Sequence, residues 1–128
     1  MMGAEQLTLL EPVDGKLMRQ TVIRELKNYR ALKVQLENKK EREEAGVVGL
    51  FPVLRKEDNL AELKVKQIER ALEYSLDEIE REIIQIKYLE SKQTKDINIY
   101  MDLGLKKEKY YEKKGAAILN IATSLGII

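Results

Sequence analysis

Residues 95–117, KDINIYMDLGLKKEKYYEKKGAA, constrain the fold of this chain more than any other segment. The pattern predicts two short helices joined by a glycine, as in a helix-turn-helix. We expect the first helix to end near Leu103, and Gly104 to supply the left-handed turn that ends a helix at little cost. Leu105 then enters the second helix as a core anchor, and Tyr110 faces inward on the same side.

The ends of this unit also carry recognisable signals. Thr94 or Asp96 can cap the first helix through a side-chain oxygen. Ile99, four residues before Leu103, is expected to face the core. The second helix is expected to continue its buried side toward the C-terminus through a stripe of small and apolar residues: Ala117, Ile118, Ile121, Leu125 and Ile127.

Lysines dominate the exposed positions of the predicted second helix. Each lysine can neutralise one backbone phosphate of a nucleic acid, and a tyrosine hydroxyl can donate to a phosphate or pack on a sugar or base edge. The alternative is a three-helix domain whose lysines only solvate one face. The candidate DNA-binding residues are Lys95, Lys106, Lys107, Lys109, Tyr111, Lys113 and Lys114.

Base recognition is less well supported than phosphate contact. Between Lys106 and Lys114 there is no Arg, Asn or Gln, which are the side chains that most often make paired hydrogen bonds to bases. Whole-chain charge is only +1, so the bulk composition does not indicate a nucleic-acid binder. The distribution of charge along the chain does indicate one. Residues 55–90 carry seven basic and ten acidic residues, whereas residues 91–128 carry seven basic and four acidic residues.

Catalysis and metal binding have little support in the composition. The 128 residues include no Cys and no His, which removes thiolate chemistry, Cys-rich zinc sites and the usual general base near neutral pH. No phosphate-binding loop or nucleophile elbow is present. One acidic cluster stands out, but it fits a helix cap and a solvated helix face: Asp77, Glu78, Glu80 and Glu82. We therefore expect no enzyme, no cofactor and no metal.

The N-terminus and the apolar runs of the sequence indicate in which cellular compartment we expect the protein. No apolar run approaches the roughly 18 residues that a membrane span requires. The N-terminus lacks a basic segment followed by an apolar core, so we expect no secretory signal. The absence of cysteine fits a reducing compartment, and the expected location is the cytoplasm.

The N-terminal half predicts two helices separated by an apolar loop. After an irregular or strand-like lead-in over residues 1–14, a long helix is expected over 16–45 and a second over 55–74. Gly46 is the expected helix stop. Apolar stripes mark the two helices: Val22, Ile23, Leu26, Tyr29, Leu32 and Leu36 in the first, and Ala61, Val65, Ile68 and Leu72 in the second. The helices form either an antiparallel hairpin or a dimer zipper.

The loop over residues 46–54, GVVGLFPVL, holds the single Phe of the chain and no charge. We expect it to fold over the junction between the helices and to bury Val48, Phe51 and Leu54. The alternative is an exposed docking patch.

A further helix is expected after residue 75. Ser75 and Glu78 have the spacing of a capping box. The expected inward face comprises Leu76, Ile79, Ile83 and Ile86, broadened by Ile84, Tyr88 and Leu89, and residues 90–93 form a connection. The predicted fold is therefore all-α, with a helical hairpin or arm over 1–74 and a helix-turn-helix domain over 75–128.

The order of residues in the C-terminal half resembles a known family. The run from Leu76 to Ile83, followed by KYLE at 87–90, resembles the helix that precedes the reading helices in region four of bacterial sigma factors. INIYMDLGL, the pair Tyr110-Tyr111 and the ending ATSLGI at 122–127 are similar to the ArpU family of phage-encoded regulators of late genes. The similarity covers roughly residues 75–127, and the N-terminal part is similar less specifically.

The resemblance implies a phage or prophage transcriptional regulator, an activator, in the cytoplasm of a bacterial host. It implies that the helix from about Lys106 to Asn120 enters the major groove of double-stranded DNA, with residues 106–109 and 111–114 facing it. The chain departs from the family, which tends to have Ser at position 106 and to be rich in Arg around 112–116. Here Glu112, Gly115 and Ala116 occupy that part.

Two other functions remain open at this level. The first is a protein-interaction module that docks on RNA polymerase, with the acidic segment 55–90 and the apolar loop 46–54 as candidate surfaces. The second is a DNA-packaging subunit like the small terminase proteins, which combine a helix-turn-helix with oligomerising helices. A homodimer is a further expectation compatible with the regulator.

Overall fold

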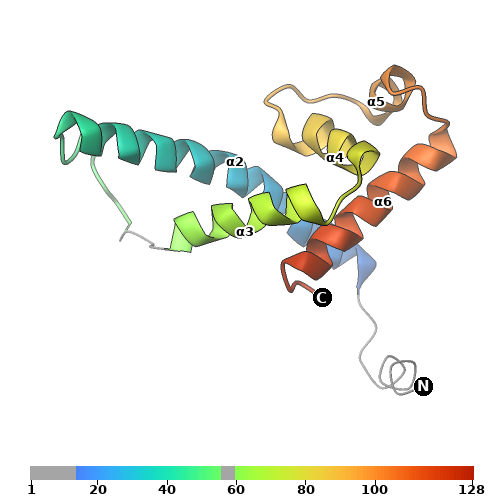
Figure 1. The fold of residues 1–128 in the computed structure, drawn as a ribbon, viewed down its shortest axis with the longest axis horizontal. Coiled ribbons are helices and arrows are strands. Elements are labelled where there is room, and N and C mark those ends of the chain that lie inside the picture. The colour runs from blue at the N-terminus through green and yellow to red at the C-terminus, as the bar shows by residue number, and fades with distance from the viewer. Residues whose placement is uncertain (1–13, 56–59) are drawn as a thin grey trace, which may run out of the picture.

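The computed structural model describes residues 14–55 and 60–128, and within these ranges the chain is helical without a strand (Figure 1). This confirms the predicted all-α class. The elements, in chain order, are α2 (Gly15–Ala45), α3 (Leu60–Tyr74), α4 (Glu78–Ile84), the π-helix η1 (Gln85–Leu89), α5 (Asp96–Asp102) and α6 (Lys107–Ser124). The irregular or strand-like lead-in predicted over residues 1–14 lies, except for Asp14, outside the described residues.

Helix α2 has a defined cap at each end. At its N-terminus, the Asp14 carboxylate accepts hydrogen bonds from the backbone N–H groups of Lys16 and Leu17. At its C-terminus, Gly46 takes a left-handed conformation with φ of +70°, and its neighbour Val47 donates to the Arg42 carbonyl. Side-chain oxygens and glycine are the preferred solutions for the unsatisfied groups at helix ends. The predicted long helix and its stop at Gly46 are confirmed.

Helices α2 and α3 form a hairpin within one chain. Val22, Leu26 and Tyr29 of α2 are buried in the same cluster as Val65 and Ile68 of α3. Polar contacts flank this seam, since the Tyr29 hydroxyl donates to Glu69 at 2.8 Å, Lys33 pairs with Glu69 and Lys64 pairs with Glu25. Of the two arrangements open to the sequence, the structure shows the hairpin. Helix α3 is described from Leu60, and Arg55, where the sequence predicts the helix to begin, is not helical; residues 56–59 lie outside the described part of the chain.

The apolar loop after Gly46 is exposed, contrary to the prediction that it buries three of its side chains. The exposed fractions are 102% for Val48, 78% for Phe51 and 98% for Leu54. The loop does not reach the core because the nearby outer turns of α2 offer it no apolar surface: residues 37–44 are ENKKEREE. The exposure that the alternative prediction of a docking patch requires is confirmed.

The capping box of α4 uses other residues than predicted. Asp77 is the N-cap, and its carboxylate accepts from the Glu80 backbone N–H while the Glu80 carboxylate accepts from the Asp77 N–H, both at 2.8 Å. The Ser75 hydroxyl instead donates back to the Ala71 carbonyl at the end of α3. Both spacings fit a capping box, and the turn that separates α3 from α4 decides between them.

The helix that follows Asp77 changes from an α-helix to a π-helix at Gln85. Residues 85–89 form a π-helical turn, which accommodates an additional residue per turn and changes the direction of successive side chains. Tyr88 is therefore buried in the core shared with α2 and α6, while the adjacent Lys87 reaches Thr94 and Asp96 near the start of α5. The predicted inward face holds for Leu76 and Ile83, but Ile79 is exposed because it follows the N-cap on the outer side of the first turn.

One core joins the two halves of the chain. Residues from the base of the hairpin pack with η1 and with the C-terminal part of α6, which includes Ala117, Ile118 and Ile121. A smaller cluster joins α4, α5 and the start of α6. The packing therefore crosses the boundary that the sequence places at residue 75. Among the described residues, no helix combines the length and the apolar character needed to cross a bilayer.

Candidate nucleic-acid interface

The turn between α5 and α6 has the geometry that the sequence predicts. Gly104 has a φ of +68°, and Leu105 donates to the Tyr100 carbonyl at 2.8 Å, which closes the end of α5. A Cβ built on Gly104 meets nothing within 4 Å, so the backbone conformation alone accounts for glycine there. Lys106 is the N-cap of α6 and makes no side-chain capping hydrogen bond.

The helices α4, α5 and α6 meet at a small apolar centre. Ile83, Ile99 and Tyr110 come from the three helices and are each at most 1% exposed. The Tyr110 ring lies 5.5 Å from the Tyr100 ring and 5.1 Å from the Tyr111 ring. Figure 1 shows α5 almost end-on while α6 runs across the picture, so the two helices cross steeply. This is the arrangement of a trihelical helix-turn-helix, and Tyr110 is inward as predicted.

Asp96 connects α5 to both neighbours. Its carboxylate accepts from the Tyr110 hydroxyl at 2.5 Å and from the Lys114 ammonium at 3.0 Å, and Lys87 lies 3.6 Å away. Burial alone would raise the pKa of Asp96, but these hydrogen bonds and the two ammonium charges bring it below its ordinary value. Burial and the bond to Asp96 raise the pKa of Tyr110. The neutral hydroxyl and the ionised carboxylate thus stabilise one another.

Lys114 belongs to this buried arrangement and does not lie on the open surface as predicted. Its side chain is 16% exposed. The ammonium lies 5.9 Å from the ring centres of Tyr88 and Tyr110 and 5.6 Å from that of Tyr111, within the range of cation–π attraction. Lys114 follows Tyr110 by four residues, so its stem shares the inward stripe of α6.

Lys113 is also used inside the chain. Its ammonium lies 2.6 Å from the Asp77 carboxylate, across the gap between α6 and the N-cap of α4. The hydrogen bond to Asp77 raises the pKa of Lys113, and the Glu80 backbone bond together with Lys113 lowers the pKa of Asp77. The prediction that Lys113 and Lys114 are exposed is therefore wrong, since each is partly buried and paired with an aspartate.

Three of the five remaining candidates lie at the start of α6. Lys106, Lys107 and Lys109 are exposed on the first turn of α6 or just before it, Tyr111 is 45% exposed, and Lys95 precedes α5. Lys109 lies 3.7 Å from Glu112, a contact between two exposed side chains that contributes little in water. Lys106, Lys107 and Lys109 present cationic side chains at the amino-terminal end of a long helix, which itself attracts anions.

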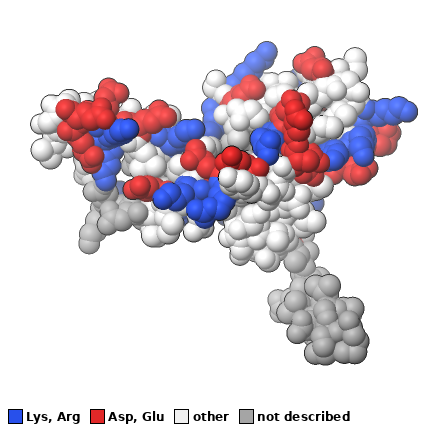
Figure 2. Space-filling model, viewed as in Figure 1, with Lys and Arg blue, Asp and Glu red and all other residues white. Residues whose placement is uncertain are grey.

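The outer face of α6 is not basic. Glu108, Glu112, Gly115 and Leu119 recur at helical spacing opposite the buried side, and all four are exposed. Figure 2 shows blue and red side chains alternating over the lobe formed by α4, α5 and α6. Of the candidate cations, only the lysines at the start of α6 and Lys95 are therefore exposed, while acidic side chains occupy the centre of the exposed face of α6.

Sequence reasoning missed the role of Asp96. Asp96 and Thr94 were the expected caps of α5, but the N-cap is Lys95, without a side-chain bond. The helical phase that places Tyr110 inward also places Lys114 inward, and this signal was available in the sequence. In comparisons with known proteins, no family model, no curated protein and no solved structure matches the chain.

Proposed function

We propose that this chain is a DNA-binding transcriptional regulator without enzymatic activity, and that it contacts double-stranded DNA through the start of α6. The observation that carries the proposal is the steep α5–Gly104–α6 turn, which leaves the basic amino-terminal end of α6 exposed. The resemblance to the ArpU family supports a narrower form, a sequence-specific activator of phage or prophage late genes that acts in the bacterial cytoplasm.

The first turn of α6 is suited to phosphate. The Lys106 side chain does not cap the helix, so the backbone N–H groups of the first turn remain available to a phosphate oxygen. Lys106, Lys107 and Lys109 surround this end, and Lys95 adds a fourth cation from the start of α5. In this arrangement the helix end and the lysines fix the position of the protein on the duplex backbone.

Base contacts fall to other side chains. Glu108 and Glu112 repel phosphates, but a carboxylate accepts a hydrogen bond from the amino group of cytosine in the major groove. Tyr111 lies between them in sequence and is partly exposed. In this proposal, sequence specificity comes from Glu108, Tyr111 and Glu112. The two carboxylates also keep phosphates away from this part of α6.

The test is duplex binding over a salt series. Four phosphate contacts by Lys95, Lys106, Lys107 and Lys109 give a log–log salt slope of about −3.6 per chain, whereas six lysines including the two internal ones would give about −5.4. Replacing Lys107 and Lys109 by Ala should weaken binding and reduce the magnitude of the slope by about 1.8.

The matched control replaces two exposed lysines of the hairpin, Lys27 and Lys66, by Ala. This pair removes the same charge outside α5 and α6 and should leave the slope unchanged. Equal slopes for the parent and for the Lys107 and Lys109 variant would refute the proposed contact, as would a failure to bind any duplex at low salt.

A second candidate is docking on RNA polymerase. Helix α5 exposes two apolar side chains four residues apart, Ile97 at 52% and Met101 at 69%, beside a surface of mixed charge. Such a patch suits a protein partner better than DNA. Retention by polymerase in the absence of DNA, lost when both residues become Ser, would favour this candidate.

A further inference from the structure

Two lysines of α6 are paired with aspartates of the same chain, and the two pairs differ in their surroundings. Lys114 has a side chain 16% exposed beside three tyrosine rings, and its partner Asp96 also accepts from the buried Tyr110. The side chains of Lys113 and Asp77 are 23% and 48% exposed, and neither belongs to an apolar cluster. The pair between Lys113 and Asp77 can therefore separate without disturbing the core.

Lys113 continues a row of lysines along one side of α6. Positions three and four residues apart lie on the same side of a helix, so Lys106, Lys109 and Lys113 follow one another over about 10 Å. Lys106 and Lys109 are exposed and belong to the proposed phosphate contact. Lys113 has the same helical phase, but its ammonium lies 2.6 Å from the Asp77 carboxylate. The row therefore contains three cations, of which one already has an anionic partner.

The Asp77 carboxylate is held in place by its own helix. Its Oδ1 atom accepts from the backbone N–H of Glu80 at 2.8 Å, as the N-cap of α4, and its Oδ2 atom accepts from the Lys113 ammonium at 2.6 Å. The Asp77 N–H in turn donates to the Glu80 carboxylate. A carboxylate that is already ordered loses little entropy on pairing with a lysine, whereas a phosphate must be brought from solution. Asp77 therefore competes with phosphate for Lys113.

We propose that Asp77 withholds Lys113 from the DNA backbone and thereby lowers the sequence-independent affinity of the chain for duplex DNA. The ligand that Asp77 replaces at Lys113 is a backbone phosphate. This role of Asp77 rests on the proposed function, since Lys113 lies in the same row as Lys106 and Lys109. The number of phosphate contacts is then limited by an internal carboxylate, and not only by the number of lysines on that side of α6.

The substitution Asp77→Asn separates the two roles of Asp77. The asparagine oxygen can still accept from the Glu80 N–H, because Asn is as good an N-cap as Asp, whereas the charge that holds Lys113 is lost. The measurement is binding of the full chain to a random duplex over a salt series, since phosphate contacts do not depend on sequence. With Lys113 released, the log–log slope should steepen from about −3.6 to about −4.5, and affinity at 0.1 M salt should rise by about eightfold.

The substitution Lys113→Ala tests whether the gain comes from this lysine. In the parent chain it should leave the slope at about −3.6, because Lys113 is already withheld. In the Asp77→Asn chain it should return the slope from about −4.5 to about −3.6. A gain that persists without Lys113 would mean that the lost negative charge acts at a distance, and it would overturn the proposal. A reduced slope for Lys113→Ala in the parent chain would overturn it as well.

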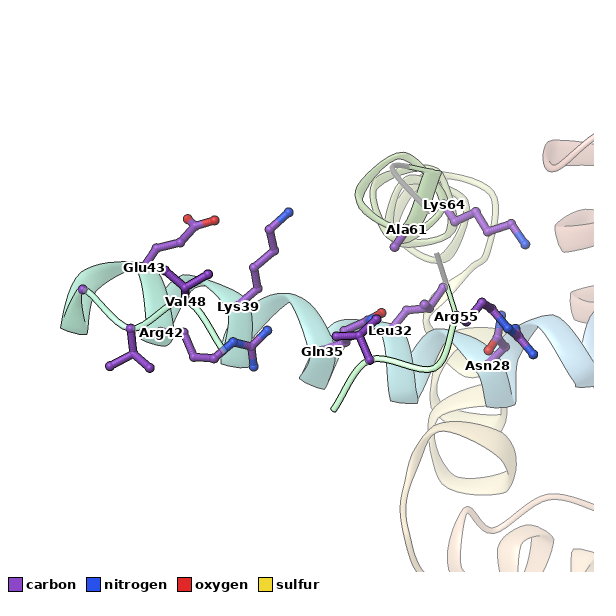
Figure 3. Close-up of a pocket in the computed structure, with 13 residues that line it drawn as sticks. Asn28, Leu32, Gln35, Lys39, Arg42, Glu43, Val48, Arg55, Ala61 and Lys64 are labelled. Carbon is purple, nitrogen blue, oxygen red and sulfur yellow. The ribbon is translucent and has the colours of Figure 1, made fainter. Parts of the chain in front are cut away.

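The matched control removes a carboxylate from a basic cluster outside the helix-turn-helix. A groove of about 870 Å³ lies between α2, the loop after Gly46 and the start of α3 (Figure 3). Glu43 is one of its lining residues, and the other charged ones are basic: Lys39, Arg42, Arg55 and Lys64. Glu43 lies near the outer end of α2, which Figure 1 shows away from α6. Glu43→Gln changes the net charge as Asp77→Asn does but releases no lysine of α6, so the slope should remain at about −3.6.

Further outcomes separate this role of Asp77 from the proposed function. Far-UV circular dichroism verifies that each variant is folded, and Asp77→Ser, a second uncharged cap, should reproduce the slope of Asp77→Asn. If Asp77→Asn keeps the slope of the parent while Lys107→Ala with Lys109→Ala reduces it, the role of Asp77 is overturned and the proposed function stands. If neither the parent nor Asp77→Asn binds any duplex, both are overturned. An equal change of slope for Glu43→Gln and Asp77→Asn would also contradict the role of Asp77.

Discussion

Replacing Asp96 by Asn tests the internal support of the helix-turn-helix. The amide keeps the size of the side chain but removes the charge that Tyr110 and Lys114 approach at 2.5 and 3.0 Å. Tyr110 is fully buried, and the Lys114 side chain is 16% exposed, so neither group recovers full hydration when the carboxylate is lost. The change therefore leaves a largely buried ammonium with a neutral acceptor in place of its anionic partner.

The expected loss can be worked from these contacts. A hydrogen bond to a charged group contributes about 1.5–3 kcal/mol, and the longer pair with Lys87 adds little because it is partly exposed. We expect the free energy of unfolding to fall by about 2 kcal/mol. For a chain of this size that corresponds to a decrease in Tm of about 8 °C.

Urea unfolding followed by circular dichroism at pH 7 measures this change. Asp102→Asn is the matched control, because Asp102 is an exposed acid at the end of the same helix, and its loss should change stability by less than about 0.5 kcal/mol. A double-mutant cycle with Lys114→Met should give a coupling energy of about 1 kcal/mol or more. Equal stability of Asp96→Asn and the parent, or zero coupling with Lys114, would refute the reasoning.

The pH dependence follows from the sign of the shift. The pKa of Asp96 is lower in the folded than in the unfolded chain, where it is about 3.9. Its stabilising effect is therefore complete above pH 4 to 5 and is lost as the pH falls through the lower folded value. The difference in stability between the parent and Asp96→Asn should shrink over that range, and a constant difference down to pH 2 would contradict it.

Other substitutions test single elements by the same unfolding measurement. Gly104→Ala should cost about 1 kcal/mol because φ is +68°, whereas Gly115→Ala should add about 0.5–1 kcal/mol, since it lies within α6 and a Cβ there meets nothing within 4 Å. Asp77→Ala should cost about 1–2 kcal/mol through the lost cap, whereas Ser75→Ala should cost less than about 0.5 kcal/mol. Equal effects within either pair would contradict the corresponding assignment.

Local patterns determined much of the fold. The apolar spacing of α2 and α3, the stop at Gly46 and the turn at Gly104 depend on backbone conformation and on residues close in sequence. The same holds for Tyr110, whose position relative to Leu105 and Ala117 follows from helical periodicity. These features are readable from sequence because each requires only its own segment to adopt its preferred state.

Long-range contacts decided the rest. Whether Lys113 and Lys114 are free to bind phosphate depends on Asp77 and Asp96, which are 36 and 18 residues away along the chain. Whether the loop after Gly46 is buried depends on which surface lies opposite it, and the charged end of α2 offers none. The sequence by itself determined the helices, the glycine turns and the inward stripe of α6. Only the tertiary structure decided which charges face one another and which apolar side chains remain in water, because both depend on pairing between segments that local preferences do not specify.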